Sequence, residues 1–327
     1  MQTSVIVVLS VLGALPCILY LALRMISSPR PVRIPFANRH VLITGGSSGI
    51  GFELAKLALL EGASVSILAR DIARLNEAKV ALANSTGKEV RVFSADVKNL
   101  KSLSNVATEA GPIDVLICSH GVAIPKTFED SSLDEINHML DTNLRGNLYV
   151  IKAMLPSLKN RKDNYPASIA IVSSQAGQVG IYGYAAYSAS KFGLKGLAES
   201  LQQELHCYNV RMSLIFPPDT YTPGFDKENE TKPELTKLIG GINKISSAED
   251  VAKKAVDGIK QGKFCIACNF DGWMLGIATM GMSPQPSAIN AFAEIFLVGF
   301  LRLYALFITW SWYNTLIKWE RKKEKHE

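Results

Sequence analysis

The sequence has few cysteines and few histidines, five of each in 327 residues, and neither type is grouped as a metal site or a disulfide framework requires. Only Cys265 and Cys268 have the spacing of a zinc or redox half-site, and no second pair completes it. We therefore expect no metal. An odd number of scattered cysteines also predicts free thiols, as in proteins of reducing compartments.

The chain also lacks a basic surface interleaved with aromatic residues. Its net charge is +6, but many of its basic residues lie beside the apolar ends of the chain. They are Arg24, Arg30, Arg33, Arg39, Lys318, Arg321, Lys322, Lys323 and Lys325. Because positive charges gather on the cytosolic side of membrane segments, this distribution favours membrane lipid as a partner and argues against nucleic acid.

Long apolar runs are confined to the two ends of the chain. Residues 5–23 are almost wholly apolar, and at about 1.5 Å per residue they are long enough to span a membrane. No basic side chain precedes them and no small-residue cleavage site follows, which predicts an uncleaved anchor rather than a signal peptide. The arginines that follow predict that the next part of the chain is cytosolic.

The second apolar region, residues 273–319, is rich in aromatic residues and is interrupted by Pro284, Pro286, Glu294 and Arg302. Three interpretations stay open: a membrane hairpin, an amphipathic region lying in the plane of the membrane, or an apolar entrance to an enzyme. The basic tail predicts a cytosolic C-terminus, and therefore an even number of crossings in this region or none.

Between these ends, short apolar segments rich in β-branched residues alternate with helical patterns. The predicted strands are 41–44, 64–69, 90–94, 115–119, 169–173 and 211–216, with 264–268 as a candidate last strand. The clearest predicted helices are 50–60, 133–158 and 189–205. Buried strands that alternate with helices are typical of βαβ units. The predicted fold class is therefore α/β, a doubly wound parallel sheet of the Rossmann type.

These patterns divide the chain into five parts. We expect an N-terminal transmembrane anchor (1–26), a proline-containing linker (27–39), a catalytic Rossmann domain (40–271), an apolar membrane-associated region (272–319) and a basic cytosolic tail (320–327). Late in the Rossmann domain, residues 225–247 are polar and charged, so this segment is a candidate lid over a substrate site.

A glycine-rich turn, with the sequence T-G-G-S-S-G-I-G at residues 44–51, lies where the first predicted strand meets the first helix. Glycines let the backbone turn tightly, and the N–H groups at the helix N-terminus bind a pyrophosphate. In this place the turn predicts a dinucleotide site. The predicted cofactor-binding residues of the turn are Gly45, Ser47, Ser48, Gly49, Ile50 and Gly51.

The residues after the second and third strands predict which dinucleotide is bound. A site that prefers NAD has an acidic side chain after the second strand, whereas this chain has Arg70, with Arg74 on the same predicted helical face. Two guanidinium groups suit the 2′-phosphate of NADP, so we expect NADPH. Asp96 either binds the adenine or caps the helix that starts near Asn99.

Tyr187 and Lys191 lie four residues apart and would share one face of a helix. An ammonium beside a phenol favours the phenolate, which would bring the pKa of Tyr187 below the free value of about 10. Such a phenol can donate a proton to the alkoxide that forms when a ketone receives a hydride. Upstream, Asn143 and Gly146 are poor helix formers inside a helical pattern, which indicates either a local break or close packing of another helix.

Together, residues 44–51, Asn143, Ser174, Tyr187 and Lys191 resemble the pattern of the short-chain dehydrogenase/reductase family over roughly residues 40–271. The resemblance implies that Tyr187 donates the proton in a reduction and that Lys191 lowers its pKa and binds the nicotinamide ribose. It also implies that Ser174 holds the substrate oxygen and that Asn143 keeps a water in a proton relay.

The same resemblance bears on three further positions. Ser173 is the neighbour that could be confused with Ser174, and the thirteen-residue spacing to Tyr187 favours Ser174. Thr222, with Thr220 as the alternative, stands where the family binds the cofactor carboxamide.

A homo-oligomer is a further expectation, because this fold often pairs through its long helices.

Two segments depart from the family pattern. The family's Asn-Asn-Ala-Gly after the fourth strand is here C-S-H-G at residues 118–121, so the role of the asparagines in stabilising the sheet is in doubt. The Pro-Gly near the nicotinamide is here Pro217-Pro218, which removes one backbone donor.

Several segments, among them residues 173–178, 217–220, 222–225 and 231–233, resemble a membrane-bound branch of this family. That branch uses NADPH to reduce the 3-keto group of a long-chain sphingoid ketone. The resemblance implies this substrate and an endoplasmic reticulum membrane protein whose catalytic domain faces the cytosol. The alternatives are a reductase of a steroid, a retinoid or a long-chain 3-ketoacyl thioester, or a membrane scaffold with an inactive Rossmann domain.

Overall fold

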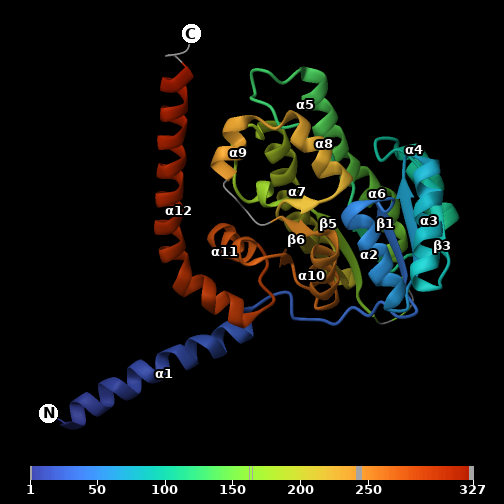
Figure 1. The fold of residues 1–327 in the computed structure, drawn as a ribbon. Helices are drawn as coiled ribbons and strands as arrows, with labels where there is room; N and C mark the ends of the chain where they lie inside the picture. Colours follow the sequence, from blue (N-terminus) through green and yellow to red (C-terminus); the bar gives the residue numbers. More distant parts are fainter. Residues whose placement is uncertain (1, 162, 164, 241–244, 324–327) are drawn as a thin grey trace.

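The computed structural model describes residues 2–161, 163, 165–240 and 245–323. Its centre is a parallel sheet in the order β3-β2-β1-β4-β5-β6-β9 (Figure 1). The strands are β1 (His40–Thr44), β2 (Ser64–Ala69), β3 (Val90–Ser94), β4 (Val115–Cys118), β5 (Ala167–Val172), β6 (Val210–Phe216) and β9 (Cys265–Ala267). The strand order reverses direction between β1 and β4, and ligands of doubly wound sheets bind beside this point, at the carboxyl ends of the strands.

Helices cover both faces of the sheet. One face packs against α2 (Gly49–Leu60), α3 (Ile72–Thr86) and α10 (Ala248–Lys260), and the other against α4 (Leu100–Ala110), α6 (Gly146–Lys159) and α7 (Ala185–Glu204). Every residue of β4, β5 and β6 is buried, as expected for strands covered on both sides. The predicted doubly wound fold is confirmed, and each predicted strand lies within two residues of an observed one.

The predicted lid segment follows β6. It contains a small sheet of β7 (Thr220–Tyr221) and β8 (Ser246–Ser247), together with α8 (Pro223–Thr231) and α9 (Glu234–Gly240). Residues 241–244 of this segment lie outside the described residues. Because β6 ends at the carboxyl edge of the sheet, α8 and α9 lie on the side where ligands bind.

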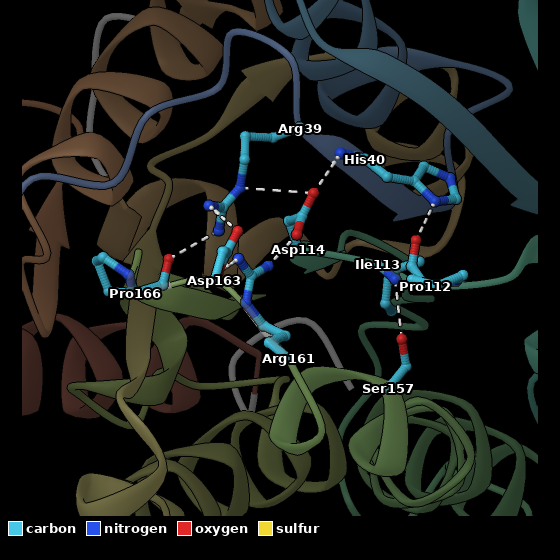
Figure 2. A network of polar contacts seen from close by, with 9 residues as sticks. All are labelled: Arg39, His40, Pro112, Ile113, Asp114, Ser157, Arg161, Asp163 and Pro166. Atoms are coloured by element: carbon cyan, nitrogen blue, oxygen red, sulfur yellow. Dashed lines mark hydrogen bonds and ion pairs between the residues drawn. The ribbon is translucent and has the colours of Figure 1, made fainter.

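A network of ion pairs joins the linker to the opposite, amino-terminal edge of the sheet (Figure 2). Arg39 is only 5% exposed, and its Nε lies 3.5 Å from Asp114 Oδ2 at the start of β4. Its Nη1 donates to Asp163 at 3.2 Å, and Arg161 pairs with both carboxylates. The backbone N–H of His40 donates to Asp114 at 2.7 Å. The chain is thereby held at the edge away from the predicted cofactor turn.

The two ends form long helices. The first helix, α1 (Gln2–Ile26), points away from the domain, whereas α12 (Ala288–Lys323) runs beside it and contacts α9 and α11 (Phe270–Thr279) (Figure 1). Among the described residues, the segment Ala288–Lys322 is the one helix long and apolar enough to cross a membrane, and none of its most apolar part is buried in the protein.

This arrangement narrows the interpretations of the second apolar region. A membrane hairpin is wrong, because a single uninterrupted helix starts after Pro286. An amphipathic helix in the membrane plane is not supported either, since exposed apolar side chains lie all around α12, for example Val298, Leu303, Tyr304 and Leu306. The predicted N-terminal anchor includes residues 1–12, whose side chains lie outside the described residues, as does the end of the tail after residue 323.

Candidate active site

The glycine-rich turn connects β1 to the start of α2. Gly45 has a φ of +68°, and a Cβ on Gly51 would clash with the Gly45 carbonyl oxygen, so neither position accepts a side chain. Ser48 is the N-cap of α2, but its side chain makes no cap hydrogen bond. The first N–H groups of α2 are therefore not satisfied by this side chain and suit a phosphate. Ser47 and Ile50 lie half-buried in the same turn.

Thr222 lies directly against this turn. A Cβ on Gly49 would be 2.9 Å from the Thr222 methyl group, and the Thr222 hydroxyl accepts from Phe225 N at the start of α8 (3.1 Å). Thr220 is buried, and its hydroxyl donates to the Pro218 carbonyl at 2.7 Å. The structure thus brings Thr222 to the predicted cofactor turn, whereas the Thr220 hydroxyl is occupied within its own loop.

Arg70 and Arg74 stand after β2, both exposed. Helix α3 starts at Ile72 behind its N-cap Asp71, so Arg70 precedes the helix and the predicted shared helical face is wrong. The physical reason is the Asp71 carboxylate, which accepts from the N–H groups of Ala73 and Arg74 and fixes the helix start. The Arg74 Nε lies 3.7 Å from the Asp71 carboxylate.

Asp96 follows β3 and is half-buried. Its carboxylate accepts from the backbone N–H of Lys98 at 2.9 Å. The N-cap of α4 is Asn99, whose side chain accepts from Ser102 N at 3.0 Å. The capping alternative for Asp96 is therefore wrong, and its contact with an adenine stays a prediction.

Tyr187 and Lys191 lie on the first turns of α7, with Lys191 Nζ 5.6 Å from the centre of the Tyr187 ring. The Ser174 side chain, just after β5, interacts with the Tyr187 phenol and favours its ionised form. Its Oγ also accepts from Ala176 N at 3.1 Å. Ser173 faces the other way: it is buried, and its hydroxyl donates to the Lys191 carbonyl at 3.2 Å. Alternation along the strand end therefore brings Ser174, and not Ser173, to the tyrosine.

Asn143 lies in a π-helical turn, Asp141–Arg145, between α5 (Leu133–Leu140) and α6. The predicted break in the long helix is present, and such turns are frequent at functional sites. The buried Asn143 amide pairs with both backbone groups of Val122 (2.8 Å each) and donates to Ser190 Oγ at 3.0 Å. Ser190 in turn donates to the Tyr187 carbonyl at 2.6 Å. Asn143 thus holds the start of α7 against the loop after β4.

The protonation of the site differs from the sequence-based expectation. The pKa of Tyr187 is raised, mainly by burial of the phenol and further by the negative charge of Glu228, whereas the hydrogen bond with Ser174 opposes the rise. Burial lowers the pKa of Lys191 to about 8, and its Nζ donates to the Val172 carbonyl at 3.1 Å. The predicted lowering of the Tyr187 pKa by Lys191 is therefore wrong here. The neutral phenol is the form that donates a proton.

The comparisons with known proteins identify the family. The family model described as short chain dehydrogenase matches residues 39–233, which hold the turn, Asn143, Ser174, Tyr187 and Lys191. This chain belongs to that family.

Curated members of the family match nearly the whole chain. A 3-dehydrosphinganine reductase of Arabidopsis thaliana is 51% identical, covering 92% of this chain and 92% of its own length. A 3-ketodihydrosphingosine reductase of Bos taurus is 37% identical, covering 97% and 96%. These are the names of the branch that residues 173–178 and 222–225 indicated, so that recognition is confirmed. Among solved structures, a levodione reductase has a TM-score of 0.66 at 23% identity, covering 74% of this chain and 99% of its own.

One functional neighbour that sequence reasoning missed is His120. It is the third residue of the C-S-H-G segment that departs from the family pattern. Its Nδ1 lies 2.6 Å from Thr44 Oγ1, and a Cβ on Gly146 would lie 3.1 Å from its Nε2. Burial, and secondly the charge of Lys191, lowers the pKa of His120 to about 3. The neutral imidazole thus fills the space between the cofactor turn and the π-helical turn. The departure of the C-S-H-G segment from the family pattern was the sequence signal that could have indicated His120.

Proposed function

We propose that the protein reduces the 3-keto group of 3-dehydrosphinganine, a long-chain α-amino ketone, to the hydroxyl group of sphinganine with NADPH. The observation that carries the proposal is the interaction of the Ser174 side chain with the Tyr187 phenol, one helical turn from Lys191, on a family fold whose curated relatives bear this reductase name. A hydroxyl pair of this kind suits a ketone oxygen, which accepts hydrogen bonds and then becomes an alkoxide.

The residues present fit a nicotinamide dinucleotide. The glycine-rich turn forms a cradle for the pyrophosphate that side chains would fill. Gly45 has a positive φ, Gly51 lies close to Gly45, and the Ser48 side chain does not cap α2. The exposed guanidinium groups of Arg70 and Arg74 suit the 2′-phosphate and support NADPH over NADH. When bound, the cofactor supplies the hydride to the carbonyl carbon.

In this proposal Tyr187 delivers the proton. Its raised pKa keeps the phenol protonated near neutral pH, so it donates to the oxygen as negative charge develops there. Ser174 holds the same oxygen and fixes its position relative to the phenol.

Lys191 and Asn143 line the site on the side of the loop that follows β4. A Cβ on Gly121 would lie 3.4 Å from Lys191 Nζ and 3.3 Å from Asn143 Oδ1, so the loop after β4 brings both side chains to one place. In this proposal Lys191, one helical turn from Tyr187, binds the hydroxyl groups of the nicotinamide ribose through its ammonium. The water relay through Asn143 stays a prediction, since its amide is engaged with Val122 and Ser190.

The exposed apolar helix α12 supports a place at a membrane, where a substrate with a long alkyl chain is dissolved. We assign the protein to the endoplasmic reticulum membrane with the catalytic domain facing the cytosol, where NADPH is available. Protease protection of epitope-tagged protein in sealed microsomes tests this orientation: the Rossmann domain should be digested without detergent.

A substrate panel tests the activity. Purified full-length protein in liposomes should oxidise NADPH with 3-dehydrosphinganine, and far more slowly with a steroid, a retinoid or a long-chain 3-ketoacyl thioester. Activity on one of those ketones without activity on 3-dehydrosphinganine would overturn the proposal.

A further inference from the structure

A cluster of charged residues lies between the α8 segment and the start of α7. The Lys232 side chain is 8% exposed, and its Nζ lies 3.1 Å from Glu228 Oε1 and 3.8 Å from Asp219 Oδ2. The same ammonium stands 4.7 Å from the centre of the Phe225 ring. Burial of a lysine is costly, and here two carboxylates and an aromatic face compensate for it.

The cluster reaches the reacting tyrosine through Tyr184. The Tyr184 hydroxyl donates to Glu228 Oε1, and the rings of Tyr184 and Tyr187 lie 5.7 Å apart. The negative charge of Glu228, and more weakly that of Asp219, also contributes to the raised pKa of the Tyr187 phenol.

The charges in this cluster do not balance. The described ion pairs set two carboxylates, Glu228 and Asp219, against the single ammonium of Lys232. The Glu228 side chain remains 15% exposed, whereas that of Asp219 is 49% exposed. An excess negative charge beside a proton donor is unfavourable for the alkoxide that forms in the reaction, unless the substrate brings a positive charge to this place.

We infer that the Glu228 carboxylate binds the amino group of the substrate, in its ammonium form, and so selects α-amino ketones. The inference rests on the proposed function. In an α-amino ketone the nitrogen lies about 2.5 Å from the carbonyl carbon, as N and C do across Cα in a residue. When Tyr187 and Ser174 bind the carbonyl oxygen of such a substrate, its nitrogen therefore lies beside Tyr187. Glu228 is held near this place by its hydrogen bond with Tyr184.

The test compares two ketones of the same chain length, 3-dehydrosphinganine and the hydroxy ketone that lacks the amino group. The full-length wild type should prefer the amino ketone by about 10- to 100-fold in kcat/KM, as expected for a charge-assisted hydrogen bond. Glu228→Gln keeps the volume and an acceptor for Tyr184, and it should lose this preference mainly through KM. Asp219→Asn is the matched control, from the same cluster but exposed, and should keep the preference within about threefold.

The outcomes separate this inference from the proposed function. If Glu228→Gln lowers kcat/KM for both ketones equally, Glu228 is a structural residue and the inference fails. An unchanged preference in Glu228→Gln, or a wild type without any preference, overturns it as well, while the proposed function stands. Glu228→Asp keeps a carboxylate and should retain more of the preference than Glu228→Gln does. A wild type that reduces neither ketone refutes the proposed function itself.

Discussion

Thr44 Oγ1 and His120 Nδ1 lie 2.6 Å apart, and this contact joins the carboxyl end of β1 to the loop that follows β4. Both residues stand at the point where the strand order reverses, which is the ligand-binding edge of such a sheet. Because Thr44 is fully buried, its hydroxyl depends on protein partners.

Removal of the imidazole should destabilise the protein. For His120→Ala we expect a loss of about 2–4 kcal/mol in the free energy of unfolding, from the cavity and from the lost partner of Thr44. His120→Asn, which restores a side-chain hydrogen bond, should lose less. Denaturant unfolding in detergent measures both variants. Equal and small losses would show that the contact contributes little to stability.

The same residue predicts a pH dependence of stability. The pKa of His120 is about 3 in the folded protein, below the unfolded value of about 6.5, so the unfolded state binds the proton first. The stability is complete above pH 6.5 and is lost as the pH falls towards 3. At pH 5.5 the loss is about 1.4 kcal/mol. His120→Asn has no imidazole to protonate, so its stability should not show this loss between pH 7.5 and pH 5.5. Thermal unfolding of the wild type and the variant at both pH values measures the difference.

Substitution of the proposed proton donor should separate chemistry from binding. Tyr187→Phe should lower kcat by at least about 1,000-fold, because the acid is lost, while NADPH still binds. Quenching of intrinsic fluorescence by NADPH measures binding, and NADPH oxidation measures turnover. Tyr208→Phe, beyond the end of α7, is the control and should behave as wild type. Turnover retained in Tyr187→Phe would refute the assigned role.

The neighbouring serines offer a matched pair. Ser174→Ala should reduce kcat by about 10- to 1,000-fold, since the Ser174 side chain interacts with the phenol. Ser173→Ala should instead cost about 1 kcal/mol in stability, since its buried hydroxyl donates to the Lys191 carbonyl. The reverse pattern would mean that Ser173 is the residue that faces the substrate.

The cofactor preference is tested by charge reversal after β2. Arg70→Glu combined with Arg74→Ala should weaken NADPH binding by about 100-fold and leave NADH binding nearly unchanged, because only NADPH carries the 2′-phosphate. Equilibrium binding of both dinucleotides gives the two constants. An equal loss for both would count against recognition of the 2′-phosphate.

The sequence by itself determined the alternation of strands and helices, the glycine-rich turn and the separation of Tyr187 from Lys191. These features are local, because periodicity, turn chemistry and helical spacing depend on near neighbours. The break at Asn143 and Gly146 also showed in the sequence, since poor helix formers stand inside a long pattern, and the π-helical turn confirmed it.

Only the tertiary structure decided what surrounds the phenol. Burial and the charge of Glu228 raise the pKa of Tyr187, which the helical spacing to Lys191 had suggested would fall. Glu228 lies 41 residues from Tyr187 along the chain and reaches it because α8 folds back over the start of α7. Desolvation and charges from distant segments set the protonation of a buried side chain, and no local pattern contains them.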